Sequence, residues 1–84
     1  MATYPITDDK YLQIENAFTY HRPFGEQPEK YEKIRGLARE VALLMVNLCP
    51  PSRELSLALT NLEQSVMWAN AAIARNETEG VDNG

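Results

Sequence analysis

Apolar residues recur at a helical spacing in three segments of the chain. In the segment from residue 52 to residue 75 they step by four and three along one face, at Leu55, Leu59, Leu62, Val66, Ala69 and Ile73. Other faces of this segment are also apolar, and Glu63 is its only charged side chain between Leu55 and Ala74. A surface helix usually carries a charged face opposite its apolar stripe. We therefore expect this helix to be covered on more than one side, by other copies of the chain.

The boundaries of this helix and of the one before it follow from local signals. Ser52 can cap the later helix through its hydroxyl, and Pro50 and Pro51 prevent an earlier start. The preceding helix is predicted from Pro28 to about Leu48, where apolar residues again step by four and three, at Ile34, Ala38, Val41, Met45 and Leu48. The very short turn between the two predicts an antiparallel helical hairpin.

A shorter helix is predicted near the N-terminus. Thr7 or Asp8 can cap it, and a stripe at Tyr11, Ile14 and Phe18 carries it to about residue 17. A helix this short is weak alone and must dock on another element. The fold class expected is all-α, a short N-terminal helix plus a long antiparallel helical hairpin, assembled as a symmetric homo-oligomer. We expect residues 1–76 to form a single helical-hairpin domain and residues 77–84 to form a flexible polar tail.

Composition narrows the classes of function. The chain has 84 residues and a formal net charge of −4, which argues against binding a nucleic-acid polymer through a broad basic face. The single cysteine, Cys49, excludes an intramolecular disulfide and a cysteine-based metal site, and we expect it to be a buried small apolar residue. No apolar run is long enough to span a membrane, and no signal peptide is evident, so a soluble intracellular protein is expected. No cofactor or metal is predicted.

Aromatic and cationic residues alternate in the loop before the hairpin, at Phe18, Tyr20, His21, Arg22 and Phe24. Such a loop can read bases and phosphates, since rings stack on bases and guanidinium groups pair with phosphates. In the alternative interpretation Phe18 and Phe24 plug a core, whereas His21 and Arg22 are solvated. Taken alone, the local sequence favours this alternative.

The predicted hairpin returns the end of the last helix to the start of the second. Arg75 should therefore lie beside Tyr31, Lys33 and Arg35, so that these cations and the aromatic loop gather at one pole. Glu63, alone in its apolar stretch, is expected to form an ion pair with a basic residue such as Arg39 or to face a channel at an oligomer axis. No paired-carboxylate signature, metal-binding motif or phosphate-cradling glycine loop is present, so an enzyme is not expected.

Two segments resemble a known family. They are FTYHRP at residues 18–23 and SRELSLALTNLEQSVMWANAAIAR at residues 52–75, and the likeness spans roughly residues 11–76. The chain is similar to the phage anti-CBASS cyclic-oligonucleotide sponges, which share an Acb2-type helical hairpin. The resemblance implies a homohexamer in the cytoplasm of an infected bacterium. It would bind cyclic dinucleotides such as cyclic GMP–AMP between protomers, and cyclic trinucleotides at separate sites near a three-fold axis. The ligand would be sequestered uncleaved, so that the immune effector stays inactive.

The resemblance also implies ligand-binding residues. An aromatic residue that stacks on a base matches Tyr20, and a basic residue early in the second helix matches Arg35 or Lys33. Arg75 would meet a phosphate at the trinucleotide site. The full set of candidates is Tyr20, Arg35, Lys33, Arg75, His21 and Arg22.

Three further residues match the family's pattern strongly, Met67, Trp68 and Asn70. We interpret them as packing and assembly residues. In an alternative interpretation, Trp68 is a platform on which a base of the ligand stacks. Two other functions compete with the sponge. In one, the hairpin is a non-enzymatic adaptor that binds a host or phage protein. In the other, the chain is an enzyme that degrades the same messengers.

Overall fold

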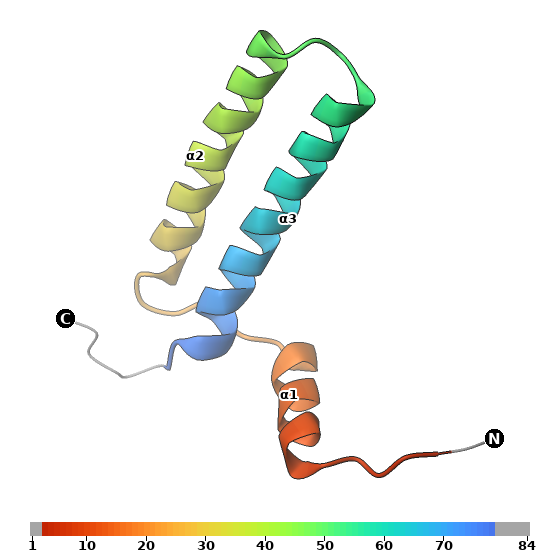
Figure 1. Ribbon diagram of the computed structural model, residues 1–84. Helices are drawn as coiled ribbons and strands as arrows, with labels where there is room; N and C mark the ends of the chain where they lie inside the picture. Colours follow the sequence, from red (N-terminus) through yellow and green to blue (C-terminus); the bar gives the residue numbers. More distant parts are fainter. Residues whose placement is uncertain (1–2, 79–84) are drawn as a thin grey trace.

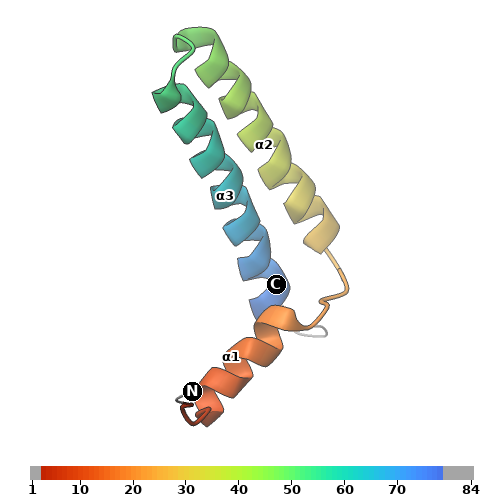
Figure 2. The same ribbon diagram turned by 90° about the vertical axis from the view of Figure 1, so that its right-hand side faces the viewer.

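The computed structural model describes residues 3–78. They form three helices, α1 (Asp8–Phe18), α2 (Gln27–Leu48) and α3 (Arg53–Asn76). Helices α2 and α3 lie side by side and antiparallel, joined by a short turn, and α1 extends away from the end of the hairpin where α3 finishes (Figures 1 and 2). We call that end, where α2 begins and α3 ends, the foot of the hairpin, and the opposite end the tip. The predicted all-α hairpin with a short N-terminal helix is confirmed for these residues.

Two of the predicted helix starts rest on hydroxyl caps. The Thr7 hydroxyl accepts a hydrogen bond from the amide of Lys10 at 3.2 Å, and the Ser52 hydroxyl accepts one from the amide of Leu55 at 3.1 Å. Each cap satisfies one of the amides that the first turn of a helix leaves unpaired. The capping role predicted for Ser52 is confirmed, and Thr7 rather than Asp8 caps the first helix.

Helix α2 begins after a turn at Gly25, whose φ of +56° lies in the left-handed region that favours glycine. Pro28 sits in its first turn, where a missing amide hydrogen costs nothing. The helix ends at Leu48, and at the C-cap residue Cys49 the backbone is extended and the amide donates to the Met45 carbonyl at 2.9 Å. Cys49 is exposed, so its predicted burial is wrong. The residue lies at the tip of the hairpin, where no described element covers it.

The hairpin is held along a single seam. The six residues that step by four and three on α3 are all half-buried against α2, as the pattern predicts. On α2 the seam uses Ile34, Ala38, Ala42 and Met45, whereas Val41 and Leu48, which the pattern placed in the stripe, are exposed. No apolar side chain among residues 3–78 is fully buried in the single chain. One seam between two helices therefore does not provide a core.

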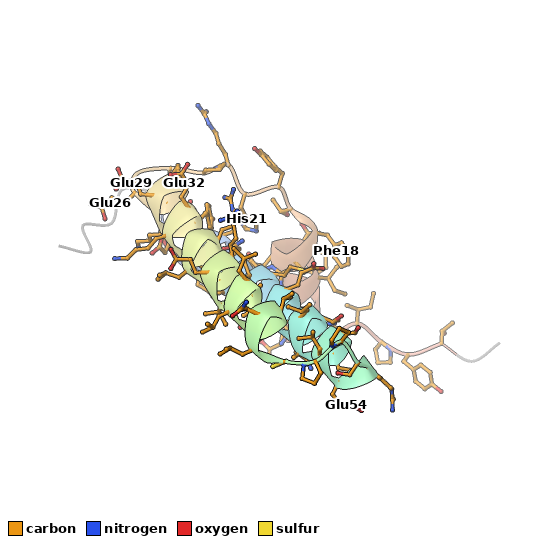
Figure 3. All side chains as sticks on the ribbon, turned by 90° about the horizontal axis from the view of Figure 1, so that it is seen from above. Phe18, His21, Glu26, Glu29, Glu32 and Glu54 are labelled. Atoms are coloured by element: carbon orange, nitrogen blue, oxygen red, sulfur yellow. The ribbon has the colours of Figure 1, made fainter. Side chains whose placement is uncertain are left out.

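The shape of the protomer agrees with this lack of a core. Its extents are 49 × 47 × 17 Å and its radius of gyration is 17.7 Å, whereas a compact domain of this length would have about 12 Å. On α3, Met67 and Trp68 remain 61% and 67% exposed. Side chains project all round the hairpin when it is viewed from above (Figure 3). The expected cover of α3 by other copies stays a prediction.

Candidate functional site

Helix α1 and the loop after it are tied to the end of α3 through Asn16. The Asn16 side-chain amide donates to the carbonyl oxygen of Arg75 at 3.3 Å. The Nε2 atom of His21 lies 2.8 Å from the Asn16 carbonyl oxygen. Since a carbonyl oxygen only accepts, this ring nitrogen carries the hydrogen and donates it. The two bonds connect both His21 and the main chain of Arg75 to Asn16.

A second tie joins the start of α2 to the end of α3. Gln27 is the one fully buried residue among those described, at 2% exposure. Its amide nitrogen donates to the Ile73 carbonyl at 3.4 Å and to the Glu77 carboxylate at 3.1 Å, and its amide oxygen accepts from the Phe24 amide at 3.2 Å. The last carbonyls of a helix lack partners within it. The Arg75 carbonyl is one of these and pairs with the distant Asn16 amide, whereas the Ile73 carbonyl accepts from Gln27 in addition to the Glu77 backbone amide at 3.2 Å.

An ion pair between Lys30 and Glu77 adds to the second tie. The hydrogen bond from Lys30 lowers the pKa of the Glu77 carboxyl below its ordinary value of 4.5, and the bond from Gln27 lowers it further. The same contact with Glu77 raises the pKa of the Lys30 ammonium above its ordinary value of 10.5. Both side chains are partly exposed, so solvent weakens the attraction. The pair helps to fix the foot of the hairpin without being a major source of stability.

These ties frame an open pocket at the foot of the hairpin, which we call the foot pocket. Its volume is about 500 Å³. The end of α1, the loop, α2 and α3 all contribute to its walls, which consist of Ala17, Thr19, Tyr20, His21, Pro23, Tyr31, Arg35, Asn70, Ala71, Ala74 and Arg75. The loop after α1, the first half of α2 and the end of α3 thus meet at one site, although they lie far apart in the sequence.

The structure sorts the six predicted ligand residues into two groups. Four of them line the foot pocket, namely Tyr20, His21, Arg35 and Arg75. Lys33 and Arg22 do not line it. Arg35 lies one helical turn after Tyr31 and shares its face of α2, whereas Lys33 lies two residues from each and faces elsewhere. Geometry therefore favours Arg35 over Lys33, and the binding role of every one of these residues stays a prediction.

The aromatic residues of the loop differ in exposure. Tyr20 is 83% exposed at the rim of the foot pocket, with its ring free to meet a flat ligand. Phe18 is 85% exposed, so it does not plug a core within one chain; it ends α1, which points away from the hairpin. Phe24 and His21 are half-buried, and Arg22 is exposed. The core-plug interpretation thus fails for Phe18.

Thr19, which no sequence pattern indicated, and Asn70, which was predicted to be a packing residue, both line the foot pocket. The Asn70 Oδ1 atom is buried and has no hydrogen-bond partner among the described residues. Asn70 interrupts an alanine-rich face of α3, and this amide between small residues was the available signal. Trp68 does not line the pocket, so the structure offers no support there for its alternative role as a stacking platform.

A second hollow lies between the two long helices and has a volume of about 390 Å³. We call it the interhelical groove; it is lined by Arg35, Ala38, Arg39, Ala42, Leu59, Leu62, Glu63, Val66 and Met67. Arg39 and Glu63 both line this groove, but they do not form the predicted ion pair. The ion pair in the part of the chain described is instead the one between Lys30 and Glu77. Arg35 borders both hollows.

Residues 3–78 hold neither a metal-binding cluster nor a helix suited to a membrane. No group of three or more histidine, cysteine or carboxylate side chains is arranged to hold a metal ion. None of the three helices combines the length and apolarity that crossing a membrane would require.

Comparison with known proteins returns one family. A family model described as Acb2/Tad1, hairpin domain, matches residues 10–74. This range contains all of α2 and almost all of α1 and α3, together with the loop that lines the foot pocket. No curated protein and no solved structure matches the chain significantly. The match confirms the family to which the two sequence segments pointed.

Proposed function

We propose that this chain, which belongs to the Acb2/Tad1 hairpin family, is a phage anti-CBASS sponge that binds cyclic dinucleotide and cyclic trinucleotide second messengers. It acts in the cytoplasm of the infected bacterium. It sequesters the messenger uncleaved and so keeps the immune effector inactive. The observation that supports this most is the meeting of Tyr20, Arg35 and Arg75 around one pocket.

The chemistry of the foot pocket suits a cyclic oligonucleotide. An exposed Tyr20 ring can stack on a base, which contributes about 1–3 kcal/mol per base. Guanidinium groups pair with phosphates through two parallel hydrogen bonds, and Arg35 and Arg75 present two of them. The volume of about 500 Å³ falls within the range of small-molecule sites, about 300–1,000 Å³.

Assembly completes the site in this proposal. The pocket is open, and a cyclic dinucleotide has two bases and two phosphates. A two-fold interface between protomers supplies two Tyr20 rings and two Arg35 side chains without making any one chain strongly basic. We propose a homohexamer, in which Arg75 meets cyclic trinucleotides near a three-fold axis. The exposed Met67 and Trp68 of a protomer without a core support such an assembly.

The charged groups of the foot pocket favour binding over cleavage. Arg35 and Arg75 hold phosphates well but do not exchange protons, since guanidinium groups stay protonated in proteins. His21 is the only imidazole in the chain, and its Nε2 hydrogen is engaged by Asn16. We therefore propose that the ligand leaves the protein intact.

An adaptor function is the second candidate. The observation in its favour is the set of large apolar side chains that the hairpin exposes, among them Leu44, Met67 and Trp68. Contiguous apolar surface marks a protein interaction site. In the sponge these side chains meet copies of the same chain, whereas in the adaptor they meet a different protein and the foot pocket stays empty.

A melting-temperature panel separates the two candidates. Ligand that binds the folded state stabilises it by mass action, by about 2.7 kcal/mol at a hundredfold excess over Kd. The sponge predicts that cyclic GMP–AMP or another cyclic di- or trinucleotide raises the Tm. Linear dinucleotides of the same composition serve as the matched ligand control. A Tm that stays constant across the whole cyclic panel contradicts the sponge and favours the adaptor.

A further inference from the structure

The His21 ring is oriented by a hydrogen bond to the main chain of α1. It lies on the loop between α1 and α2 (Figure 3) and is half-buried. Its Nε2 donates to the Asn16 carbonyl oxygen at 2.8 Å. A neutral imidazole has one donor and one acceptor nitrogen. With Nε2 as the donor, Nδ1 is the acceptor of the neutral ring.

The acceptor nitrogen has no partner within the part of the chain described. The hydrogen bond to Asn16 is the one contact of this kind that the ring makes there. The ring also lines the foot pocket, beside the exposed Tyr20. A ligand held there would therefore find an acceptor next to the aromatic ring on which its base stacks.

We infer that His21 recognises the edge of a nucleobase, with Nδ1 accepting a hydrogen bond from a base N–H group while Tyr20 stacks on the face of a base. The inference rests on the proposed function, because it assigns a role within the same pocket. A phosphodiester presents only acceptor oxygens, so a neutral Nδ1 cannot bind it. Base edges present amino and imino hydrogens, which proteins read in this way.

The charges around His21 agree with this assignment. The ring shares the lining of the pocket with Tyr20 from the loop, Tyr31 and Arg35 from α2, and Arg75 from α3. The two guanidinium groups already offer several donors each for phosphate oxygens. An additional donor would duplicate them, whereas an acceptor adds selectivity for the base.

Protonation makes the inference testable, because it turns Nδ1 from an acceptor into a donor. If Nδ1 reads a base hydrogen, acidification weakens binding. If His21 instead contacts a phosphate as a cation, acidification strengthens binding. His21 is the sole histidine, so an effect that depends on an imidazole can come from no other side chain. Whether acid weakens or strengthens ligand binding therefore shows whether His21 contacts a base or a phosphate.

The test measures the Kd of cyclic GMP–AMP at about pH 8 and about pH 5.5 for the native chain, His21→Gln and His21→Leu. Glutamine can donate to Asn16 and accept from a base in both conditions, and leucine can do neither. The native chain should bind about three- to tenfold more weakly at the lower pH. His21→Gln should retain more affinity than His21→Leu at pH 8, and its affinity should not depend on pH.

Two results would overturn the inference while leaving the sponge intact. One is tighter binding by the native chain at the lower pH, which assigns His21 to a phosphate. The other is equal affinity of His21→Leu and the native chain at both pH values. Helix content by circular dichroism shows that the leucine variant is folded; if it is not, the pH profiles of the native chain and His21→Gln decide alone. If the native chain binds neither cyclic GMP–AMP nor any other cyclic di- or trinucleotide at pH 8, the proposed function itself is contradicted, and the inference falls with it.

Discussion

The side-chain amide of Asn16 donates to the main-chain carbonyl oxygen of Arg75 at 3.3 Å, joining residues that lie 59 positions apart in the sequence. Arg75 belongs to the last turn of α3, where carbonyl groups have no partner within the helix. The carbonyl of Asn16 in turn accepts from His21. One asparagine thus connects α1, the aromatic loop and α3, all of which contribute to the walls of the foot pocket.

Replacing Asn16 by alanine should weaken ligand binding without unfolding the hairpin. The change removes the hydrogen bond to Arg75, which contributes about 0.5–1.5 kcal/mol, so the affinity for cyclic GMP–AMP should fall about three- to tenfold. Isothermal titration calorimetry measures the Kd, and circular dichroism measures the helix content. Asn61→Ala, an exposed asparagine of α3 outside the pocket, is the control. Equal Kd values for both variants would show that the pocket does not need this bond.

Tyr20→Ala should reduce the affinity for cyclic dinucleotides and leave the oligomer intact. Loss of one base-stacking contact costs about 1–3 kcal/mol, which corresponds to about 5- to 150-fold in Kd. The matched control is Tyr4→Ala, since Tyr4 and Tyr20 are both 83% exposed but Tyr4 lies outside the foot pocket. Unchanged affinity in Tyr20→Ala would show that the stacking assignment is wrong.

Arg35→Ala should reduce the affinity for the ligand more than Lys33→Ala does, although each substitution removes one positive charge. A hydrogen bond to a charged group contributes about 1.5–3 kcal/mol, so Arg35→Ala should raise the Kd by about ten- to a hundredfold. Arg35 lines the foot pocket and Lys33 does not. Titrations at two salt concentrations separate a direct contact from long-range attraction. Equal losses in the two variants would indicate attraction by net charge alone.

Acid should lower the folding stability of the native chain more than that of the variant Glu77→Gln. Contacts with Lys30 and Gln27 lower the pKa of Glu77 in the folded state. A lowered carboxyl pKa contributes stability that is present above the unfolded value and is lost as the pH falls through the folded value. The difference in denaturation midpoint between the two proteins should therefore shrink below about pH 4.5. A difference that stays constant from neutral pH into this range would contradict the contact.

Trp68→Ala should loosen the assembly rather than the protomer. Trp68 is 67% exposed on α3 and touches neither hollow of the single chain. If copies of the chain cover it, removal of its large ring should lower the mass measured by multi-angle light scattering at low concentration. The helix content per chain at high concentration should change little. A full-size oligomer at all concentrations would show that Trp68 is not an assembly residue.

The helices could be predicted from the sequence because the residues that start them act within one helical turn of their own position. Thr7, Ser52 and Pro28 set helix starts through their own hydroxyls and ring, and the seam on α3 follows from the spacing of its apolar residues. Cys49 was misjudged because its apolar character does not reveal that it occupies the hairpin tip.

The pocket could be predicted only in part. The short turn of the hairpin requires Arg75 to return beside Arg35, and this is what the structure shows. The position of α1 rests instead on one bond between Asn16 and Arg75, which no periodic pattern encodes. The burial of Gln27 likewise depends on carbonyl and carboxylate partners 46 and 50 positions away. Such single polar contacts between distant residues are invisible to spacing arguments.

The most direct test of the sponge is a capture-and-release measurement with cyclic GMP–AMP. The protein is incubated with the ligand, the mixture is filtered, and the retained protein is denatured by heat before chromatography of the released material. The account predicts that the ligand disappears from the filtrate and returns chemically intact on heating. Recovery of a cleaved product would show an enzyme. If the ligand remained free throughout, and a panel of cyclic di- and trinucleotides behaved in the same way, the sponge would be contradicted.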